Sequence, residues 1–351
     1  MLSPARQVAY RFLFNFSASY SGGGLKRLVA YARWFSQRGG AWFAIHPRCG
    51  DLVRAVPGNR YFIVDQARFR RLYADCEYLE GIGAEVGVPA LYYAFGIPMY
   101  ARFGVVNWFH QCNVLPMYSR GIPLSVFDRA KLGVLGWKTR RTLCNADIVS
   151  AESQFSLALI GGVDSRQLRL SVLGSDDELE SLRAVQPGPK ESIATVVGTA
   201  RYKSLVESYR VFEALKRRDG PLTLVIIGEK QMIPRQLRSW GDVVATGVLE
   251  RGRVMEYLKR SRYYISTTLI EGSYNAASEG VFSANESYIS DIGPHRELLA
   301  NMQYERIQVP GVDGPVLHVR REDVSATNLK SWEEVITDIV RAVAERQGPA
   351  N

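Results

Sequence analysis

Two glutamates in the second half of the chain are spaced to bind hydroxyl groups at the end of a strand. Residues 271–279 read EGSYNAASE, so Glu271 and Glu279 are separated by seven residues. The pattern predicts a strand at 263–266 and a helix at 275–282. Glu271 then lies in the loop at the strand's carboxyl end, where open α/β sheets bind ligands. One carboxylate is placed for a sugar hydroxyl and the other for a ribose hydroxyl, although glutamate pairs also occur on solvated helices.

Two cations, Arg201 and Lys203, follow another predicted strand, at 193–197, and precede a predicted helix at 205–216. Cations at a helix N-terminus form charge-assisted hydrogen bonds with phosphate oxygens. They are suited to bind a diphosphate and to stabilise the charge that develops as it departs from a sugar. A solvated helix start is the alternative, but cations there oppose the helix dipole.

A glycine-rich turn comes early in the chain. Residues 21–24 read SGGG, between a strand predicted at 8–16 and a helix predicted at 25–37. Backbone N–H groups of Gly23 and Gly24 can approach a phosphate there. The turn is neither GxGxxG nor a P-loop, so a tight turn without a ligand is equally compatible.

A histidine occupies a comparable position later in the same half. His110 directly follows a strand predicted at 105–109. Because it follows Trp108 and Phe109, the residues alone favour a histidine of the hydrophobic core.

The elements that must position these residues alternate between strand and helix along the chain. This rhythm predicts parallel sheets covered on both faces, and it occurs twice. Two prolines and a glycine at 187–189 mark the break, so residues 1–186 and 187–330 are expected to form two doubly wound α/β domains. A last helix is predicted at 332–346, with Ser331 and Glu334 as a capping box. Residues 331–351 are expected to pack back on the N-terminal domain.

Charge is distributed unevenly between the two halves. Residues 1–170 hold 21 Lys and Arg against 10 Asp and Glu, whereas residues 171–351 hold 23 against 25, for a formal net charge of +9. The +11 of the first half implies an anionic partner. One segment, 129–143, interleaves basic residues with Trp and Leu on a predicted helix. It suits contact with an anionic membrane surface, and a surface helix with a solvated basic face is the alternative.

Several classes are disfavoured. The most apolar segment, 86–109, is interrupted by two prolines and an arginine, so no membrane-spanning helix is expected. The four cysteines form no CxxC pair, which disfavours a disulfide scaffold or a zinc ribbon and indicates the cytosol. No DxD triplet follows a strand, so no metal and no cofactor are expected.

Residues 290–298, SDIGPHREL, complete a set of motifs in order: the glycine turn, the cations after a strand, the two glutamates and this segment. Together they resemble the retaining glycosyltransferases of family 4, most closely over residues 193–300. The resemblance implies the GT-B fold, two Rossmann-like doubly wound domains facing a cleft.

The resemblance also implies roles for individual residues. Gly23 and Gly24 match the turn near the donor phosphates, and His110 matches the histidine that contacts the transferred sugar. Glu271 matches the glutamate near the donor sugar, and Glu279 the one on the ribose.

The second domain supplies the remaining matches. Arg201 and Lys203 match the diphosphate-binding cations. The backbone that would face sugar and phosphates is that of Ser273, Tyr274, Asn275 and Ala276. The chain departs from the family at Ser273 and Tyr274, where Phe-Gly is common, and Tyr274 is expected to narrow the sugar pocket.

The resulting hypothesis is an enzyme that transfers a hexose-type sugar with retention from a nucleotide-diphosphate sugar, either GDP-mannose-type or UDP-hexose. The acceptor would be lipid-linked or a glycan, in cell-surface polysaccharide or lipopolysaccharide biosynthesis. The enzyme would lie on the inner face of the cell membrane, held by its basic half. A catalytically silent GT-B partner subunit and a basic nucleic-acid-binding protein are the alternatives.

Overall fold

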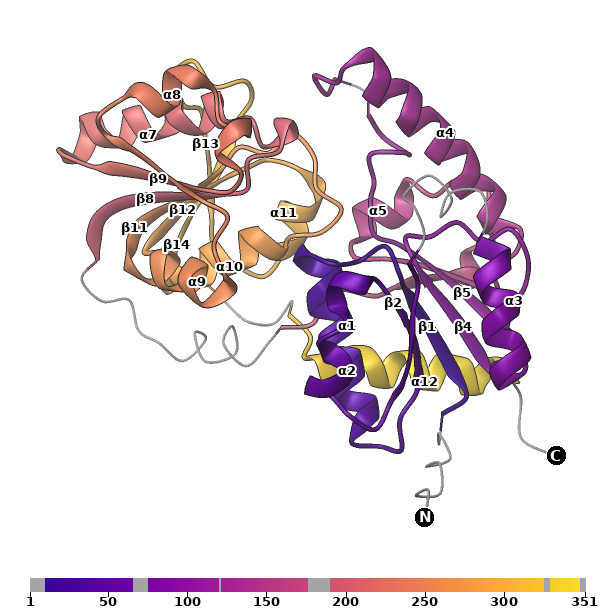
Figure 1. Ribbon diagram of the computed structural model, residues 1–351. Helices are drawn as coiled ribbons and strands as arrows, with labels where there is room; N and C mark the ends of the chain where they lie inside the picture. Colours follow the sequence, from indigo (N-terminus) through magenta and orange to yellow (C-terminus); the bar gives the residue numbers. More distant parts are fainter. Residues whose placement is uncertain (1–9, 66–74, 120, 176–189, 325–328, 348–351) are drawn as a thin grey trace. The chain divides into compact units, whose positions relative to one another are not determined.

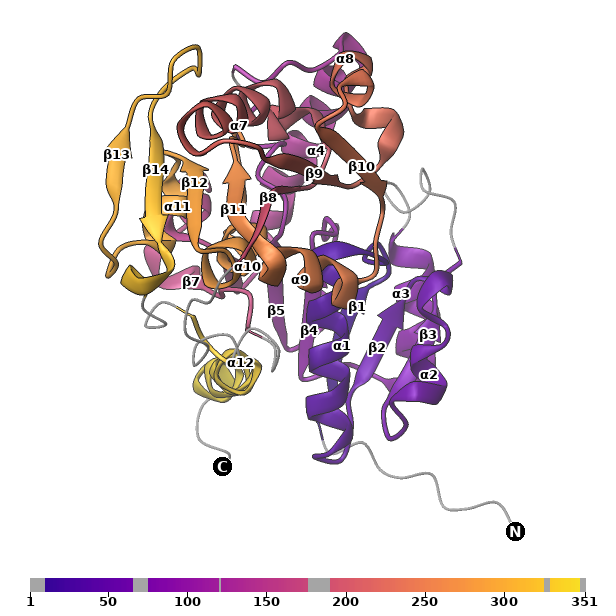
Figure 2. The ribbon, with the colours of Figure 1, turned by 90° about the vertical axis from the view of Figure 1, so that its left-hand side faces the viewer.

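The computed structural model describes residues 10–65, 75–119, 121–175, 190–324 and 329–347 (Figures 1 and 2). The chain forms two compact units. Unit 1 comprises residues 1–119, 126–174 and 330–351, and unit 2 comprises residues 120–125 and 175–329. The boundary predicted at residue 186 lies outside the described residues.

Unit 1 is built on a seven-stranded sheet in the order β3-β2-β1-β4-β5-β6-β7. Every neighbouring pair is parallel. The strands are β1 (Phe12–Phe16), β2 (Trp42–Ile45), β3 (Arg60–Ile63), β4 (Leu91–Phe95), β5 (Val106–Gln111), β6 (Ile148–Ala151) and β7 (Leu168–Leu170). The order reverses between β1 and β4, which is where ligands bind in doubly wound sheets.

Helices cover both faces of this sheet. They are α1 (Gly22–Ser36), α2 (Leu52–Ala55), α3 (Asp75–Val86), α4 (Val126–Leu143), α5 (Gln154–Ala158) and α12 (Trp332–Gln347). Alternate residues of β1 enter different cores: Phe14 packs with α1 and α12, whereas Leu13 packs with residues of α3 and α5. Because successive residues of β1 are buried on opposite faces of the sheet, unit 1 has three layers, with helices on either side of the sheet.

The C-terminal helix α12 belongs to unit 1, where it packs beside α1 (yellow and indigo in Figure 1). Its apolar stripe, with Ile336 and Ile339, is buried in the same core as α1. The predicted capping box is confirmed, because the Glu334 N–H donates to Ser331 Oγ (3.2 Å) and the Ser331 N–H donates to the Glu334 carboxylate (2.7 Å).

Unit 2 contains a second seven-stranded sheet, in the order β10-β9-β8-β11-β12-β14-β13. Its strands are β8 (Glu191–Val197), β9 (Thr223–Ile227), β10 (Val243–Gly247), β11 (Ser261–Ser266), β12 (Glu286–Ser290), β13 (Glu305–Ile307) and β14 (Val316–Arg320). The first five in spatial order are parallel. The order reverses between β8 and β11.

The helices of unit 2 also lie on two faces. They are α7 (Leu205–Asp219), α8 (Arg235–Ser239), α9 (Arg251–Arg260), α10 (Asn275–Ser283) and α11 (Gly293–Leu298). Residues of α7 and α8 share one core with Ile265 of β11, whereas residues of α9, α10 and α11 share the other with Tyr264.

The predicted α/β class is confirmed, and four local predictions are corrected. The first strand begins in the described residues at Phe12, and helix α1 begins at Gly22 rather than after the glycines. His110 lies within β5 rather than after it. The second sheet is not wholly parallel, since β14 runs antiparallel to β12 and β13 antiparallel to β14. Within the described residues, no helix is long and apolar enough to cross a membrane.

Candidate functional site

The carboxyl ends of β8 and β11 meet at the point where the strand order of unit 2 reverses. These strands are direct parallel neighbours, with Tyr264 paired in register with Thr195. The segment 198–204 leaves the end of β8, and the segment 267–274 leaves the end of β11. Both loops that carry predicted site residues therefore start from adjacent strands at one edge of the sheet.

The first loop is a tight turn that fixes the backbone of both predicted cations. Residues 201–203 form one turn of 3-10 helix, and Ser204 closes it in the left-handed region with φ of 47°. This is the one positive φ among the described residues other than glycine, and such strain persists only where neighbouring contacts enforce it.

Contacts from the second loop hold this turn. The N–H of Leu269 donates to the Tyr202 carbonyl at 2.7 Å, and Thr267 Oγ1 donates to the Ser204 carbonyl at 2.9 Å. Ser208 Oγ lies 2.8 Å from Thr267 Oγ1 and ties the start of α7 to the same point. The two loops thus form one hydrogen-bonded assembly.

This assembly brings Lys203 and Glu271 into an ion pair. Their side chains are only 11% and 19% exposed, so the pair is shielded from solvent. Gly198, with φ of 95°, lies beneath the lysine: a Cβ added there would come within 3.0 Å of Lys203 Cε. Arg201, from the same turn, is exposed. One cation is therefore fixed against a carboxylate and the other is open to solvent.

His295 lies near this pair. Its Nδ1 donates to the Ser290 carbonyl at 2.8 Å, which fixes the ring at the end of β12. Burial lowers the pKa of His295 to about 4, and the positive charge of Lys203 adds to the shift. The neighbouring Arg296 pairs with Asp291 at 2.9 Å. These contacts indicate that His295 and Arg296 have a structural role: they hold the start of α11 in place.

Glu279 lies in the second turn of α10 and is buried. Its Oε1 accepts a hydrogen bond from Arg251 Nη1 at 2.5 Å. Arg251 is the first residue of α9 and follows β10, so a third strand of the sheet contributes to the site. Sequence reasoning missed Arg251, although a basic residue just after a strand, at a helix start, was an available signal.

The start of α10 presents backbone N–H groups in the same region. Helix α10 begins at Asn275, and its first N–H groups have no partner within the helix. No acidic residue lies in this first turn. Ser273 is buried, while Asn275 and Ala276 are partly exposed.

Tyr274 has a different place from the one expected. Its side chain is 7% exposed and belongs to the core formed with Met255, Leu258 and Tyr264. It fills this core because α10 packs closely on β11: a Cβ at Gly280 would lie 2.2 Å from the Tyr264 ring. The expectation that Tyr274 narrows a sugar pocket therefore gives way to a packing role for the ring, and only its backbone stays a candidate for ligand contact.

In unit 1, Gly23 and Gly24 form the first turn of α1 at the end of β1. A Cβ at Gly24 would lie 2.9 Å from Ser19 Oγ and 3.0 Å from the Phe95 ring. Gly24 is therefore required by close packing, and Gly22 by its φ of 60°. The contact of Gly23 and Gly24 with a phosphate stays a prediction.

His110 is completely buried in β5. Trp108 Nε1 donates to Ser150 Oγ at 2.7 Å, and His110 Nδ1 lies 2.8 Å from the same oxygen. Nε2 of the ring lies 3.7 Å from the Glu152 carboxylate, beyond hydrogen-bond distance. The ring also stacks on Phe95, with centroids 5.0 Å apart.

Burial lowers the pKa of His110 to about 4, so the ring is neutral at pH 7. Glu152 also pairs with Arg27 of α1 at 3.1 Å, and Arg27 is itself completely buried. Burial alone raises the pKa of Glu152, but His110 and Arg27 outweigh it and hold that pKa below its usual value. A contact of His110 with a sugar stays a prediction.

The structure thus brings Arg201, Lys203 and Glu271 together in unit 2, and it places Glu279 on Arg251. Gly23, Gly24 and His110 belong to unit 1. No group of three or more potential metal ligands occurs among the described residues. The prediction that no metal takes part is untested.

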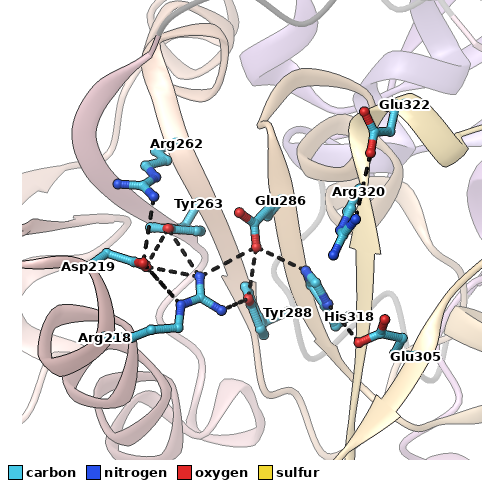
Figure 3. A network of polar contacts seen from close by, with 10 residues as sticks. All are labelled: Arg218, Asp219, Arg262, Tyr263, Glu286, Tyr288, Glu305, His318, Arg320 and Glu322. Carbon is cyan, nitrogen blue, oxygen red and sulfur yellow. Dashed lines mark hydrogen bonds and ion pairs between the residues drawn. The ribbon is translucent and has the colours of Figure 1, made fainter.

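A second polar network in unit 2 lies at the opposite end of the strands, around the starts of β11 and β12 (Figure 3). Arg218, at the end of α7, donates to the Tyr288 hydroxyl at 3.0 Å. His318 Nε2 lies 3.0 Å from Glu286, and this contact lowers the pKa of Glu286. The Tyr263 hydroxyl donates to Asp219 at 2.6 Å. These partners satisfy one another, which indicates a structural role.

No family model and no curated protein matches this sequence. Solved structures do. A glycosyltransferase from Rickettsia africae superposes with a TM-score of 0.64 at 12% identity, covering 97% of this chain and 99% of that one. Sucrose-phosphate synthase from Thermosynechococcus elongatus gives 0.61 at 13% identity, covering 83% and 84%. The chain has the GT-B fold.

HepE from Anabaena, another GT-B neighbour, was solved in complex with UDP and glucose. It superposes with a TM-score of 0.56 at 14% identity, covering 96% of this chain and 91% of that one. At these sequence identities, the similarity to solved structures shows the fold alone. Function therefore has to be argued from the site.

Proposed function

We propose that this GT-B protein is a glycosyltransferase of the family 4 type, which transfers a hexose-type sugar with retention from a nucleotide-diphosphate sugar. The observation that carries the proposal is the ion pair of Lys203 with Glu271, at the strand-order reversal of unit 2, with Arg201 on the same turn. A cation and a carboxylate held side by side offer a donor to phosphate and an acceptor to sugar hydroxyls.

Each residue of the site has a role in this proposal. Lys203 and Arg201 stabilise the charge on the departing diphosphate, because fixed cations act where charge develops. Lys203 has three N–H donors, so it can keep Glu271 and bind phosphate together. Glu271 contacts the donor sugar. Glu279, fixed by Arg251, contacts the ribose. The start of α10 offers N–H groups to the phosphates.

The structural neighbours favour one of the two donors. HepE was solved with UDP and also with UDP-glucose, and the trehalose-phosphate synthase from Burkholderia xenovorans is described as UDP-forming. A UDP-hexose is therefore the first donor to test, and a GDP-mannose-type donor the second. The acceptor we propose is lipid-linked or a glycan, in cell-surface polysaccharide or lipopolysaccharide biosynthesis, with the enzyme on the inner face of the membrane.

Nucleotide binding by isothermal titration calorimetry tests the site. We expect the wild type to bind UDP or GDP at least tenfold more tightly than the corresponding monophosphate. Lys203→Ala and Arg201→Ala should each weaken diphosphate binding about tenfold or more, the range for a charge-assisted hydrogen bond, with little change for the monophosphate. Arg201 is the cleaner probe, because its removal leaves the pair of Lys203 and Glu271 intact.

Glu279→Gln tests the ribose contact. The wild type should prefer the ribonucleotide to its 2′,3′-dideoxy analogue, and the variant should lose that preference.

Arg262→Ala is the matched control for Arg201→Ala. Arg262 lies at the start of β11, away from the carboxyl end, and its loss should leave nucleotide affinity unchanged. If no nucleotide diphosphate binds, or if the Arg262 control loses as much affinity as Arg201→Ala, the proposed site is wrong. Retention is checked by the anomeric configuration of the product in NMR.

A further inference from the structure

Helix α4 carries an exposed face that combines large apolar side chains with cations. Val126, Phe127, Val134 and Trp137 are 87%, 77%, 45% and 52% exposed. Exposed apolar residues are common singly, but four along one helix form a patch that needs an explanation.

The helical geometry places these side chains on one stripe. At 100° per residue, Phe127, Val134, Trp137 and Arg141 fall within an arc of about 80°. The guanidinium of Arg141 lies over the Trp137 ring, 4.5 Å from its centroid. The stripe is therefore a continuous surface of two aromatic rings, a valine and a cation.

Cations flank the stripe. Lys131 lies on one side, and Arg129 and Arg140 lie on the other. These three and Arg141 are all exposed. No ion pair joins any of the four to a carboxylate in the part of the chain that the structure describes. We call the seven residues Phe127, Arg129, Lys131, Val134, Trp137, Arg140 and Arg141 the α4 face.

The other side of α4 packs onto unit 1. Leu132 and Leu143 are buried, and a Cβ at Gly136 would lie 2.4 Å from the Pro116 carbonyl oxygen. Lys138 falls about 20° from Phe127 around the helix. It is nevertheless only 2% exposed, so this lysine is not part of the basic face that the sequence suggested. The helix thus has a packed side and the α4 face.

We infer that the α4 face binds the interface of an anionic lipid bilayer. Aromatic and aliphatic side chains of such a helix enter the boundary between headgroups and acyl chains, while flanking Lys and Arg contact anionic headgroups. The net charge of +11 in residues 1–170 adds long-range attraction of the same sign. The inference names the membrane contact within the proposed function, but it rests on exposure and charge alone.

Vesicle co-sedimentation of the full chain tests it. Vesicles of phosphatidylglycerol and phosphatidylcholine are compared with phosphatidylcholine alone. We expect binding to the anionic vesicles, weakened by salt. The double variant Arg140→Gln, Arg141→Gln should lose about tenfold or more in affinity, since each cation near the surface contributes separately. The double variant Phe127→Ser, Trp137→Ser should lose affinity by a similar factor. This loss should be the same at low and at high salt.

Matched controls lie in unit 2. Arg235 and Arg238 of α8 are exposed, so Arg235→Gln with Arg238→Gln removes the same charge elsewhere. Val248, 75% exposed, gives Val248→Ser as the apolar control. Both controls should bind vesicles as the wild type does. Affinity for UDP, measured without vesicles, should be unchanged in every variant, which separates this test from that of the donor site.

Four results would overturn the inference. The first is a wild type that does not bind anionic vesicles, and the second is an α4 variant that binds like the wild type. The third is an equal loss in the α8 control, which would show that diffuse charge acts rather than the α4 face. A wild type that binds a nucleic-acid duplex more tightly than vesicles, with the loss in α4 variants confined to the duplex, would assign the face to nucleic acid instead.

Discussion

At the scale of single residues, two of the three buried histidines, His110 and His295, hold their elements together as neutral rings. His110 lies between Ser150 and Glu152 in unit 1, and His295 is fixed by the Ser290 carbonyl in unit 2. Each ring gives up solvation of its charged form in exchange for fixed hydrogen bonds. Adding a second proton to either ring therefore costs free energy, and this cost can be measured.

Acidification should destabilise both units between pH 6.5 and 4. Burial lowers the pKa of each histidine to about 4, whereas an unfolded histidine titrates near 6.5. In that window the unfolded chain binds more protons, so the free energy of unfolding falls as pH falls, by up to about 1.4 kcal/mol per pH unit for each ring. Above pH 6.5 this contribution is fully present. Urea unfolding at pH 7, 6 and 5 measures this pH dependence, with hydrogen exchange used to monitor each unit separately.

The variants act as controls for one another. His110→Gln should flatten the pH dependence of unit 1 and leave that of unit 2, and His295→Gln should do the reverse. A double variant whose pH dependence equals that of the wild type would show that the rings take up protons without cost, contrary to their burial.

At the scale of elements, two glycines in α4 have opposite meanings. Gly133 is exposed and has nothing within 4 Å of an added Cβ, whereas a Cβ at Gly136 would lie 2.4 Å from a backbone oxygen of Pro116. Gly133→Ala should therefore raise the free energy of unfolding of unit 1 by roughly 0.5–1 kcal/mol, the gain in helix propensity. Gly136→Ala should lower it, because backbone atoms must move apart.

Urea unfolding of the two variants measures this difference. The pair is matched, since both changes add one methyl to the same helix. Equal stabilisation by both would mean that α4 does not pack on the segment around Pro116 as closely as the structure shows.

The sequence predicted most of the elements, since the strand–helix rhythm follows from periodicity and packing. It placed the start of α1 too late, because three glycines in a row indicate a loop, whereas a helix start tolerates them when Gly24 must pack against Phe95. It missed β13 and β14, since a short antiparallel pair at the edge leaves no βα signal.

The site shows the same division. The placement of Arg201 and Lys203 after β8, and of Glu271 after β11, followed from strand ends alone. The pairing of Glu279 with Arg251 did not, because it depends on which helix start lies beside α10 in space. The buried ring of Tyr274 was also not predictable, since a tyrosine in a loop motif can face either core or ligand.

At the scale of the whole molecule, the core of unit 1 includes a helix that follows unit 2 in the sequence. Helix α12 contributes Ile336 and Ile339 to the core that contains Phe14 and α1, although more than 300 residues separate α12 from β1. Most of unit 2, residues 175–329, lies in the sequence between two segments of unit 1. Unit 1 therefore combines segments from both sides of unit 2, whereas unit 2 is one nearly continuous segment.

Ile339→Ala should accordingly destabilise unit 1 alone. Ile339 is 1% exposed, and truncation of such a side chain costs about 2–5 kcal/mol. Hydrogen exchange followed by mass spectrometry should show lost protection in peptides of β1, with β8 unchanged. Ile265→Ala, in the core of unit 2, is the matched control and should give the opposite pattern. Equal loss of protection in β1 and β8 for Ile339→Ala would mean that the two units unfold as one, because a cavity in one core then lowers the stability of both.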